Sequence, residues 1–331
     1  MRRLTILVAV MALIYSAYWF IGATATERGA RGALDNLTQL GWDISYDSLN
    51  TRGFPSRFDT TFDEIDLSAP DGSIRFSAPF VQTMSLSYQP NHVIAAFPER
   101  QVLTLGGQEI VIEADRLRAS GGVAANTALS LDTLTAEVGA AVLTSNFGWD
   151  LALDSGLLAL REKGPQAFSY DAYINADGVA LPSNLIALFD PTNAHPAKIT
   201  TVVLDTTLTL DRGLDRHSLA EIERDPPLLT AVELNKLTVN WGEMSLTGDG
   251  QFVIGTDGRP EGEITIRASE WRAMIDLLRS AELIQPGLLT MAEGFATSLS
   301  GGATQLELPI TFRDGIMLLG PLPVGPAPKF Y

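Results

Sequence analysis

The stretch Leu4–Ile21, LTILVAVMALIYSAYWFI, contains no charged side chain over eighteen residues. As a helix rising about 1.5 Å per residue it covers about 27 Å, close to the ~30 Å hydrocarbon core of a bilayer. The two arginines before it favour a cytoplasmic N-terminus, and Tyr15, Tyr18 and Trp19 suit the opposite interface. The stretch therefore predicts a single span of the inner membrane, with the bulk of the chain in the periplasm.

A cleaved signal peptide is the alternative for residues 1–25. Ala23-Thr24-Ala25 is typical of a small-residue cleavage site. The apolar run is nevertheless longer than the roughly 7–15 residues of an ordinary signal peptide, which favours a retained anchor. Under both interpretations residues 26 onward are exported.

The composition indicates a folded, acidic exported region. The chain has 331 residues, 46% of them hydrophobic, which is enough for a sizeable core in one large or two medium domains. Its formal charge is −16, and setting aside Arg2 and Arg3 leaves −18 for the remainder. Such a charge disfavours nucleic acid and anionic lipid head groups as partners. With no cysteine, disulfides and thiolate chemistry are excluded.

Residues 26–181 are predicted to form a helix followed by an antiparallel β region. The helix, Thr26 to Gly41, carries apolar residues at helical spacing and should dock on the first sheet. In the strand around residues 80–88, Phe80, Met84, Leu86 and Tyr88 share one face, and the serine- and threonine-rich face is expected to be wet.

An eight-residue pattern recurs in which the alternation of apolar residues slips by one position at an Asp or Asn. A plain strand would then present its second half to the wrong face, so a bulge or kink is expected at each copy. Repeated bending of this kind suits a curled sheet with an apolar concave side. The copies span residues 60–67, 112–119, 129–136 and 232–239, with the slip at Asp63, Asp115, Asp132 and Asn235.

Residues 182–331 are predicted to form a second antiparallel β region with two inserted helices. A short helix at 182–189 opens it, and the segment 211–227 reads as a charged loop. Turns are expected at Gly248-Asp249-Gly250, at residues 257–260 and at Asp314-Gly315. Ser269 is expected to cap the first inserted helix. The prolines after residue 320 are expected to stop strand pairing.

The apolar stripes of the two inserted helices are expected to be core, with a lipid clamp as the alternative. Their members are Trp271, Met274, Ile275 and Leu278 in the first helix, and Leu288, Met291, Phe295 and Leu299 in the second.

No catalytic, metal-binding or cofactor-binding motif is apparent. His92, His195 and His217 are far apart and do not have the spacing of metal ligands. The chain has no nucleophile elbow, no Walker loop and no complete dinucleotide fingerprint. The sequence therefore predicts a protein that is not an enzyme and needs no metal or cofactor, although a hydrolase without a recognisable motif stays open as a third reading.

Several turn motifs, together with the N-terminal anchor, resemble one bacterial family along nearly the whole chain. They are Arg52-Gly53-Phe54-Pro55, Val239-Asn240-Trp241-Gly242 and the run from Leu308 to Gly315. The sequence is similar to the family called domain of unknown function 2125. More remotely it is similar to the AsmA-like envelope proteins, a likeness that implies a curled sheet with an apolar groove and a role in lipid homeostasis.

The fold predicted overall is mainly β: an N-terminal transmembrane helix followed by large curled antiparallel sheets with a few covering helices. The function favoured is binding of a lipid or another apolar ligand in a sheet groove, without catalysis. The alternative is an assembly factor that pairs a sheet edge with a partner envelope protein. The candidate groove residues are Leu86, Leu208, Leu237, Trp241 and Trp271.

Overall fold

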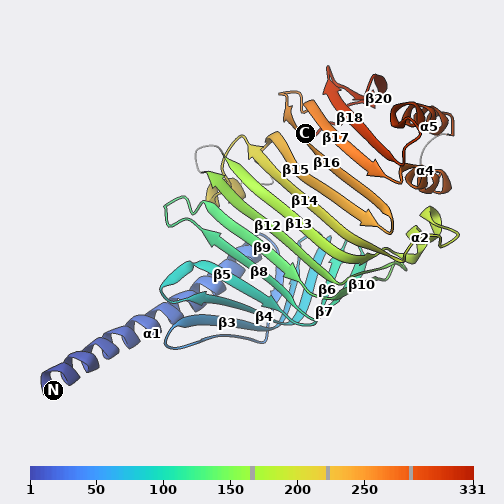
Figure 1. The fold of residues 1–331 in the computed structure, drawn as a ribbon. Helices are drawn as coiled ribbons and strands as arrows, with labels where there is room; N and C mark the ends of the chain where they lie inside the picture. The colour runs from blue at the N-terminus through green and yellow to red at the C-terminus, as the bar shows by residue number, and fades with distance from the viewer. Residues whose placement is uncertain (165–167, 221–223, 283–285) are drawn as a thin grey trace. The chain divides into compact units, whose positions relative to one another are not determined.

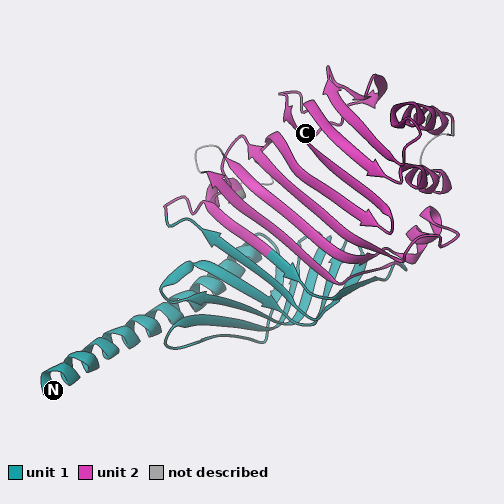
Figure 2. Ribbon diagram, in the orientation of Figure 1, with its two compact units in different colours: residues 1–125, 136–148 teal, residues 126–135, 149–331 magenta. Residues whose placement is uncertain are grey.

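The structure is a computed structural model that describes residues 1–164, 168–220, 224–282 and 286–331. It is mostly antiparallel β-sheet, with 52% of residues in strands, preceded by one long apolar helix and accompanied by a few shorter helices (Figure 1). This confirms the predicted fold class. Two compact units are present: residues 1–125 with 136–148, and residues 126–135 with 149–331 (Figure 2). We call them the N-terminal unit and the C-terminal unit.

The N-terminal unit combines the long helix with antiparallel strands. Its elements are α1 (Arg2–Gln39), β1 (Asp43–Ser45), β2 (Ser48–Arg52), β3 (Arg57–Ser68), β4 (Ile74–Leu86), β5 (Gln89–Phe97), β6 (Arg100–Leu105), β7 (Gln108–Ala114), β8 (Leu117–Val123) and β10 (Ala141–Ser145). Strand β9 (Leu131–Val138) is divided between the two units.

The C-terminal unit, in its described residues, is a succession of antiparallel strands with four helices. Its elements are β11 (Asp150–Leu153), β12 (Ser155–Gly164), β13 (Ser169–Ala180), α2 (Ser183–Phe189), β14 (Lys198–Leu210), α3 (Arg216–Ala220), β15 (Leu229–Trp241), β16 (Met244–Ile254), β17 (Pro260–Ser269), α4 (Trp271–Ser280), α5 (Pro286–Ser300), β18 (Gln305–Arg313), β19 (Ile316–Leu319) and β20 (Leu322–Pro326). Residues 221–223 of the loop predicted at 211–227 lie outside the described residues.

The membrane stretch and the amphipathic stretch form one continuous helix, α1. It is long and apolar enough to cross a membrane, and little of its most apolar window is buried in the protein. The helix ends where predicted: Gly41 has a φ of 92°, and the amide of Trp42 donates to the carbonyl of Leu37, which closes the last turn. Ala30 and Leu34 pack against the buried cluster of the first strands, as expected for a docked helix.

Docking begins well before the end of the membrane stretch. The Tyr15 hydroxyl donates to the carbonyl of Pro55 at 2.9 Å, and the Trp19 indole nitrogen donates to the carbonyl of Arg57 at 2.8 Å. Trp19 is only 5% exposed and forms a buried cluster with Ala23 and Phe58. Part of the predicted membrane span is thus built into the N-terminal unit.

Gly22 permits the close approach of α1 to β3, because a Cβ atom there would lie 2.5 Å from the buried ring of Phe58. Replacing Gly22 with leucine is therefore expected to lower the free energy of unfolding by about 1–3 kcal/mol through overpacking. Gly29 has no atom within 4 Å of its ideal Cβ position, and Gly29→Leu should be neutral or slightly stabilising because leucine is the better helix former. Urea unfolding of both variants in the same detergent, followed by circular dichroism, makes the comparison. Equal losses for the two variants would contradict it.

The predicted kinks occur at two of the slips with a clear geometric cause. Phe62 and Ile65 are buried in one cluster although a plain strand would send them to opposite faces, and Glu64 between them has a left-handed φ of 49°. In β15, Leu234 pairs with Gly250 and Leu237 with Gly248, so that Asn235 and Lys236 together face the single residue Asp249 of β16, which is a bulge.

The other two copies behave differently. At Asp115 the chain leaves β7 and begins β8, so the strand changes its partner there instead of bulging. In the third copy the left-handed residue is Leu129, before β9 begins, and β9 runs through Asp132 as one strand.

The turn predicted at Gly248-Asp249-Gly250 is wrong, because β16 runs straight through these residues. Gly250 lies opposite the β15 bulge at a φ of 142°, and a Cβ there would lie 2.4 Å from the carbonyl oxygen of Glu263. The glycines therefore allow a close, bent strand pair; the actual reversal is at Gly242-Glu243. The turns around Asp257 and at Asp314-Gly315 are confirmed.

The prolines near the C-terminus do not prevent strand pairing, contrary to the prediction. β20 pairs with β19, with Leu322 opposite Leu319 and Pro326 opposite Ile316. Proline is tolerated at an edge strand, where its missing N–H would point away from the sheet.

Two further predictions, one about exposed residues and one about a helix cap, fail at single residues. Ser87, just after β4 on its serine face, is not wet: it is fully buried and shares a hydrogen bond with the hydroxyl of Tyr15 on α1. Thr83 and Ser85 on the same face are half-buried. Ser269 does not cap α4, whose N-cap is Glu270 without a side-chain capping bond.

The predicted stripe of α5 is also wrong in part. The buried residues of α5 are Leu289 and Ala296, whereas Met291 and Leu299 are exposed. The side chain of Leu288 lies outside the described part of the chain. Helical spacing alone does not fix the rotation of α5 about its axis. Packing against β18 turns Leu289 and Ala296 toward the sheet.

The sequence predicts a domain boundary after Leu181, between residues 26–181 and 182–331. This boundary stays a prediction. In the structure β13 and β14, which flank Leu181, pair along their length within the C-terminal unit.

Candidate functional site

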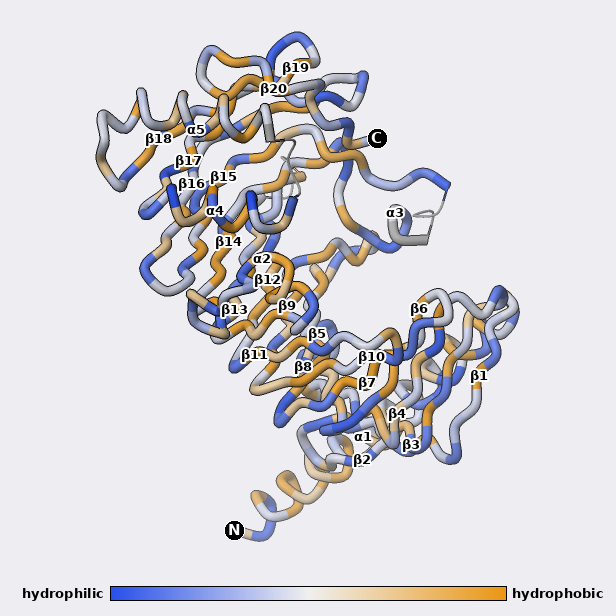
Figure 3. The backbone as a smooth tube through the Cα atoms, turned by 90° about the vertical axis from the view of Figure 1, so that its right-hand side faces the viewer, coloured by the Kyte–Doolittle hydropathy of each residue, from blue (hydrophilic) through white to orange (hydrophobic). Residues whose placement is uncertain are grey.

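The C-terminal unit has a sheet with one apolar and one polar face. Directly paired residues on neighbouring strands share a face, so the register assigns each side chain. From β12 to β18 the alternation of hydropathy can be followed along the strands in Figure 3. The apolar face carries Leu158, Leu160, Ala172, Ile174, Val202, Leu204, Leu208, Val232, Leu234, Leu237, Val239, Leu246, Phe252, Ile264, Ile266, Leu308 and Ile310.

One cross-strand line on this face is apolar from β12 to β18, and we call it the apolar row. Strands are spaced about 4.8 Å apart, so its span from β12 to β18, six spacings, is about 29 Å. This exceeds the ~15 Å depth of one leaflet of a ~30 Å hydrocarbon core. Its members, each paired with the next, are Leu158, Ile174, Leu204, Leu237, Gly248, Ile266 and Leu308.

Among the described residues, helices α4 and α5 cover one end of the apolar row. Trp271 of α4 and Ala296 of α5 form a buried cluster with Ala268 and Leu306, and these two strand residues belong to the apolar face. At the other end Leu158 and Ile174 are 42% and 39% exposed, and the leucines between are half-buried. Large aliphatic side chains that stay in contact with water across several strands are typical of a binding surface.

The opposite face of the same sheet is polar and strongly hydrogen-bonded. Asp171 accepts from Arg161 at 3.2 Å and from Thr207 at 3.0 Å. Burial raises the pKa of Asp171, but the hydrogen bonds from Arg161 and Thr207 outweigh it and leave the pKa below its ordinary value. Arg267 similarly pairs with Asp249 and Glu307. This charged face already suits contact with water. The protein therefore does not need to expose its apolar face, and that exposure calls for another explanation.

The structure distributes the predicted groove residues over three environments. Leu208, Leu237 and Trp241 lie on the apolar face and are half-buried. The Trp241 indole donates to the carbonyl of Pro196 at 2.7 Å. Whether these residues bind a ligand stays a prediction.

The other two predicted residues lie elsewhere. Trp271 is buried, with its indole nitrogen 3.1 Å from the carbonyl oxygen of Ala303, so it holds the covering helices. Leu86 belongs to the N-terminal unit, where it lines a separate small pocket of about 150 Å³ with Met84 and Ile94.

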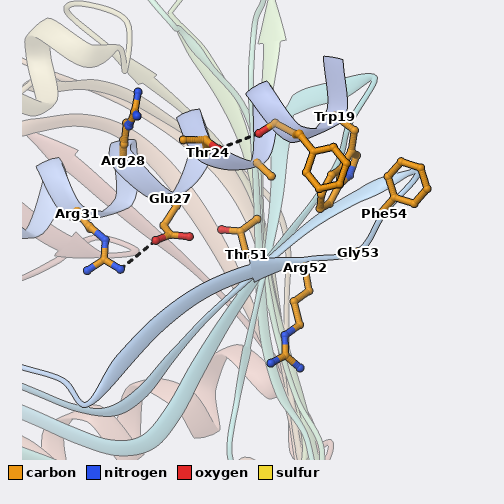
Figure 4. Close-up of a pocket in the computed structure, with 11 residues that line it drawn as sticks. Trp19, Thr24, Glu27, Arg28, Arg31, Thr51, Arg52, Gly53 and Phe54 are labelled. Carbon is orange, nitrogen blue, oxygen red and sulfur yellow. Dashed lines mark hydrogen bonds and ion pairs between the residues drawn. The ribbon is translucent and has the colours of Figure 1, made fainter. Parts of the chain in front are cut away.

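A larger cavity of about 730 Å³ lies between α1 and the end of β2 (Figure 4). Trp19, Phe20 and Phe54 form its aromatic end, with Phe20 and Phe54 stacked at 6.0 Å. Arg28 and Arg52 also line it, but Figure 4 shows them pointing away from each other. The third arginine of the lining, Arg31, is paired with Glu27 at 3.0 Å, so among the described residues Arg28 and Arg52 are the unpaired candidates and they do not converge on a phosphate group.

Sequence reasoning missed the role of the loop residue Phe54 in this cavity. Phe54 was noted only as part of a turn motif, and its contact with Phe20 depends on how β2 and β3 dock on α1. The sequence signal that could have indicated this role is the position of Phe54 before Pro55, in a loop tip without charged residues.

Within the described ranges, no group of three or more histidine or acidic side chains is placed to hold a metal ion. His195 lies against the Trp241 ring at 5.5 Å, and His217 contacts the side chain of Arg216. His195 and His217 therefore lie in different local environments.

The fold and these surfaces define a class of protein: a large antiparallel sheet, bent by bulges, that follows a long apolar N-terminal helix able to anchor it in a membrane. Residues 19–328 match the family described as "Uncharacterized protein conserved in bacteria (DUF2125)", and the chain belongs to this family. No curated protein and no solved structure matches the chain. The remote resemblance to AsmA-like proteins stays a prediction.

Proposed function

We propose that this protein is a membrane-anchored envelope protein that binds the acyl chain of a lipid on the apolar face of its C-terminal unit, without catalysis. The observation that carries the proposal is the apolar row, which continues across the strands from the helix-covered end to the exposed Leu158 and Ile174. A hydrocarbon chain laid on this row gains roughly 0.8 kcal/mol per buried methylene, so affinity needs no charged motif.

The anchor helix supports the choice of a lipid. A chain tethered to the inner membrane through residues 4–21, with its bulk in the periplasm, meets lipid as its most abundant apolar ligand. The buried cluster of Trp19, Ala23 and Phe58 favours a retained anchor, because cleavage after Ala25 would remove two of its three members. The net charge of −16 agrees with a ligand held by its apolar part and not by an anionic head group.

The edge strand β20 gives less support to the alternative of an assembly factor that pairs a sheet edge with a partner. The last strand, β20, carries Pro323 and Pro326, which lack the N–H group that edge pairing uses. The edge is therefore suited to ending a sheet, and the apolar face is the better candidate for binding.

A photo-crosslinking experiment tests the proposal. The full chain is reconstituted in vesicles that contain a phospholipid with a diazirine near the end of one acyl chain. After irradiation, cross-links are expected in peptides of β13–β15. Leu204→Asp and Leu237→Asp place a charge in the row and should reduce this labelling at least about tenfold, because the loss of only ~1.4 kcal/mol already gives that factor.

Val203→Asp is the matched control, since Val203 is a half-buried aliphatic neighbour of Leu204 on the polar face. It should leave the labelling unchanged. An equal loss in the control would point to damaged folding, and labelling confined to α1 would count against the proposal.

A further inference from the structure

The contacts of α1 set the depth of the N-terminal unit in the membrane. The first residue of the helix with a tertiary hydrogen bond among the described residues is Tyr15, whose hydroxyl lies 2.9 Å from the Pro55 carbonyl oxygen and 3.2 Å from the Ser87 hydroxyl. Tyr18 donates to the carbonyl of Ser87 at 2.6 Å. Two loops of the unit, β2–β3 and β4–β5, are thereby fixed alongside the apolar helix.

The helix before Tyr15 is too short to span a bilayer alone. From Leu4, directly after the two arginines, to Tyr15 is eleven residues, or about 16 Å at ~1.5 Å per residue. The hydrocarbon core is about 30 Å thick, and tilting the helix shortens its reach further. The first charged residue after Leu4 is Glu27, so nothing in the helix itself limits the span at Tyr15.

Several backbone carbonyls at the two loops are hydrogen-bonded inside the protein. In lipid every backbone polar group needs a partner inside the protein. The carbonyls of Pro55, Arg57 and Ser87 accept from the aromatic side chains of α1. The carbonyls of Gly53 and Ser56 accept from the amides of Arg57 and Ser87.

The side chains that these loops leave uncovered are apolar or aromatic. Phe54 is 52% exposed and Tyr88 is 72% exposed, and on the adjoining turn of α1 Phe20 and Ile21 are exposed as well. Arg52 and Arg57 lie on the domain side of the tip, and side chains of this kind can extend toward the head groups.

We infer that the tips of the β2–β3 and β4–β5 loops are inserted into the membrane leaflet distal to the N-terminus, with Phe54 and Tyr88 in contact with acyl chains. The N-terminal unit thus makes a second, non-helical contact with the bilayer. The inference requires α1 to lie in the membrane, but it is independent of acyl-chain binding by the C-terminal unit.

The absence of cysteine makes a direct test simple, because a single introduced cysteine can carry a nitroxide label. The variants are Phe54→Cys and Tyr88→Cys in the full chain, reconstituted in phospholipid vesicles. Collision rates with oxygen, which concentrates in hydrocarbon, and with a nickel chelate, which stays in water, report the depth of each label. Val8→Cys serves as the membrane reference. Ile74→Cys, at the opposite end of β4 from Tyr88, serves as the reference for water.

The ratio of oxygen to nickel collisions at positions 54 and 88 is expected to be several-fold above that at position 74 and to approach that at position 8. Ratios at 54 and 88 equal to that at 74, with position 8 in hydrocarbon, would overturn the inference and leave the anchor intact. A ratio at position 8 equal to that at position 74 would overturn both the loop insertion and the membrane anchor. Phe54→Cys removes the ring contacts with Trp19 and Phe20, whereas Tyr88 is 72% exposed, so the label at position 88 carries the test if the first variant is destabilised.

Discussion

Replacing Trp19 with alanine is expected to lower the free energy of unfolding of the N-terminal unit by about 3–5 kcal/mol, the usual range for a buried tryptophan. The side chain is almost fully buried against Phe58 and Ala23, and its indole nitrogen satisfies the carbonyl of Arg57. Its loss leaves a cavity and an unpaired carbonyl at Arg57. Both effects act on the contact that fixes α1 to the sheet.

The measurement is urea unfolding of the full chain in mild detergent, followed by far-ultraviolet circular dichroism. Ile21→Ala is the control, because Ile21 lies two residues away on the same helix and is 70% exposed. It should change the unfolding midpoint little. If Trp19→Ala were as mild as its control, α1 would be a detachable anchor and the depth argument for the loops would lose its basis.

The second large effect is expected at the other end of the chain. Trp271→Ala should destabilise the packing of α4 and α5 on the sheet by about 3–5 kcal/mol. Trp271 is 2% exposed, donates to the carbonyl of Ala303, and supports the Arg272 guanidinium 4.3 Å above its ring. Without it the helices lose the centre of their cluster.

Hydrogen exchange of the full chain resolves this effect by region. Amides of α4, α5 and β18 should exchange faster in Trp271→Ala, whereas those of β3 and β4 should keep their rates. Met291→Ala is the control, since Met291 is on α5 but 62% exposed. Unchanged exchange in α4 and α5 would show that the helices are held by other contacts.

Local patterns in the sequence predict much of this fold because they report on single elements. The uncharged run, the stop at Gly41 and the phase slips at Asp63 and Asn235 each depend on neighbours within a few residues. A phase slip is informative because the buried face must be restored, and a kink or bulge is the cheapest way to restore it.

The wrong predictions concern residues whose conformation or burial depends on a segment far away in the sequence. Gly248 and Gly250 resemble a turn in isolation, but the bulged β15 and the closely approaching β17 require glycine in mid-strand. Ser87 resembles a surface residue until α1 covers it. In α5 both the leucine-methionine stripe and the smaller residues have helical spacing, and only the shape of the sheet surface chooses between them.

The candidate surfaces were predictable to different degrees. Leu208, Leu237 and Trp241 were named as candidate groove residues from local apolar patterns, and the strand register shows that they lie on one face. Phe54 and Tyr88 could not be associated with α1, because the pairing that brings their loops to Tyr15 joins segments 40 and 72 residues apart.

The continuity of α1 has a consequence for assembly in the membrane. A helix advances by about 1.5 Å and turns by about 100° with every residue, and no flexible joint separates the apolar stretch from the docked part. The distance of the docked strands from the N-terminal arginines and their direction around the axis of α1 are therefore fixed together. One cannot be altered by insertion or deletion in residues 4–14 without altering the other.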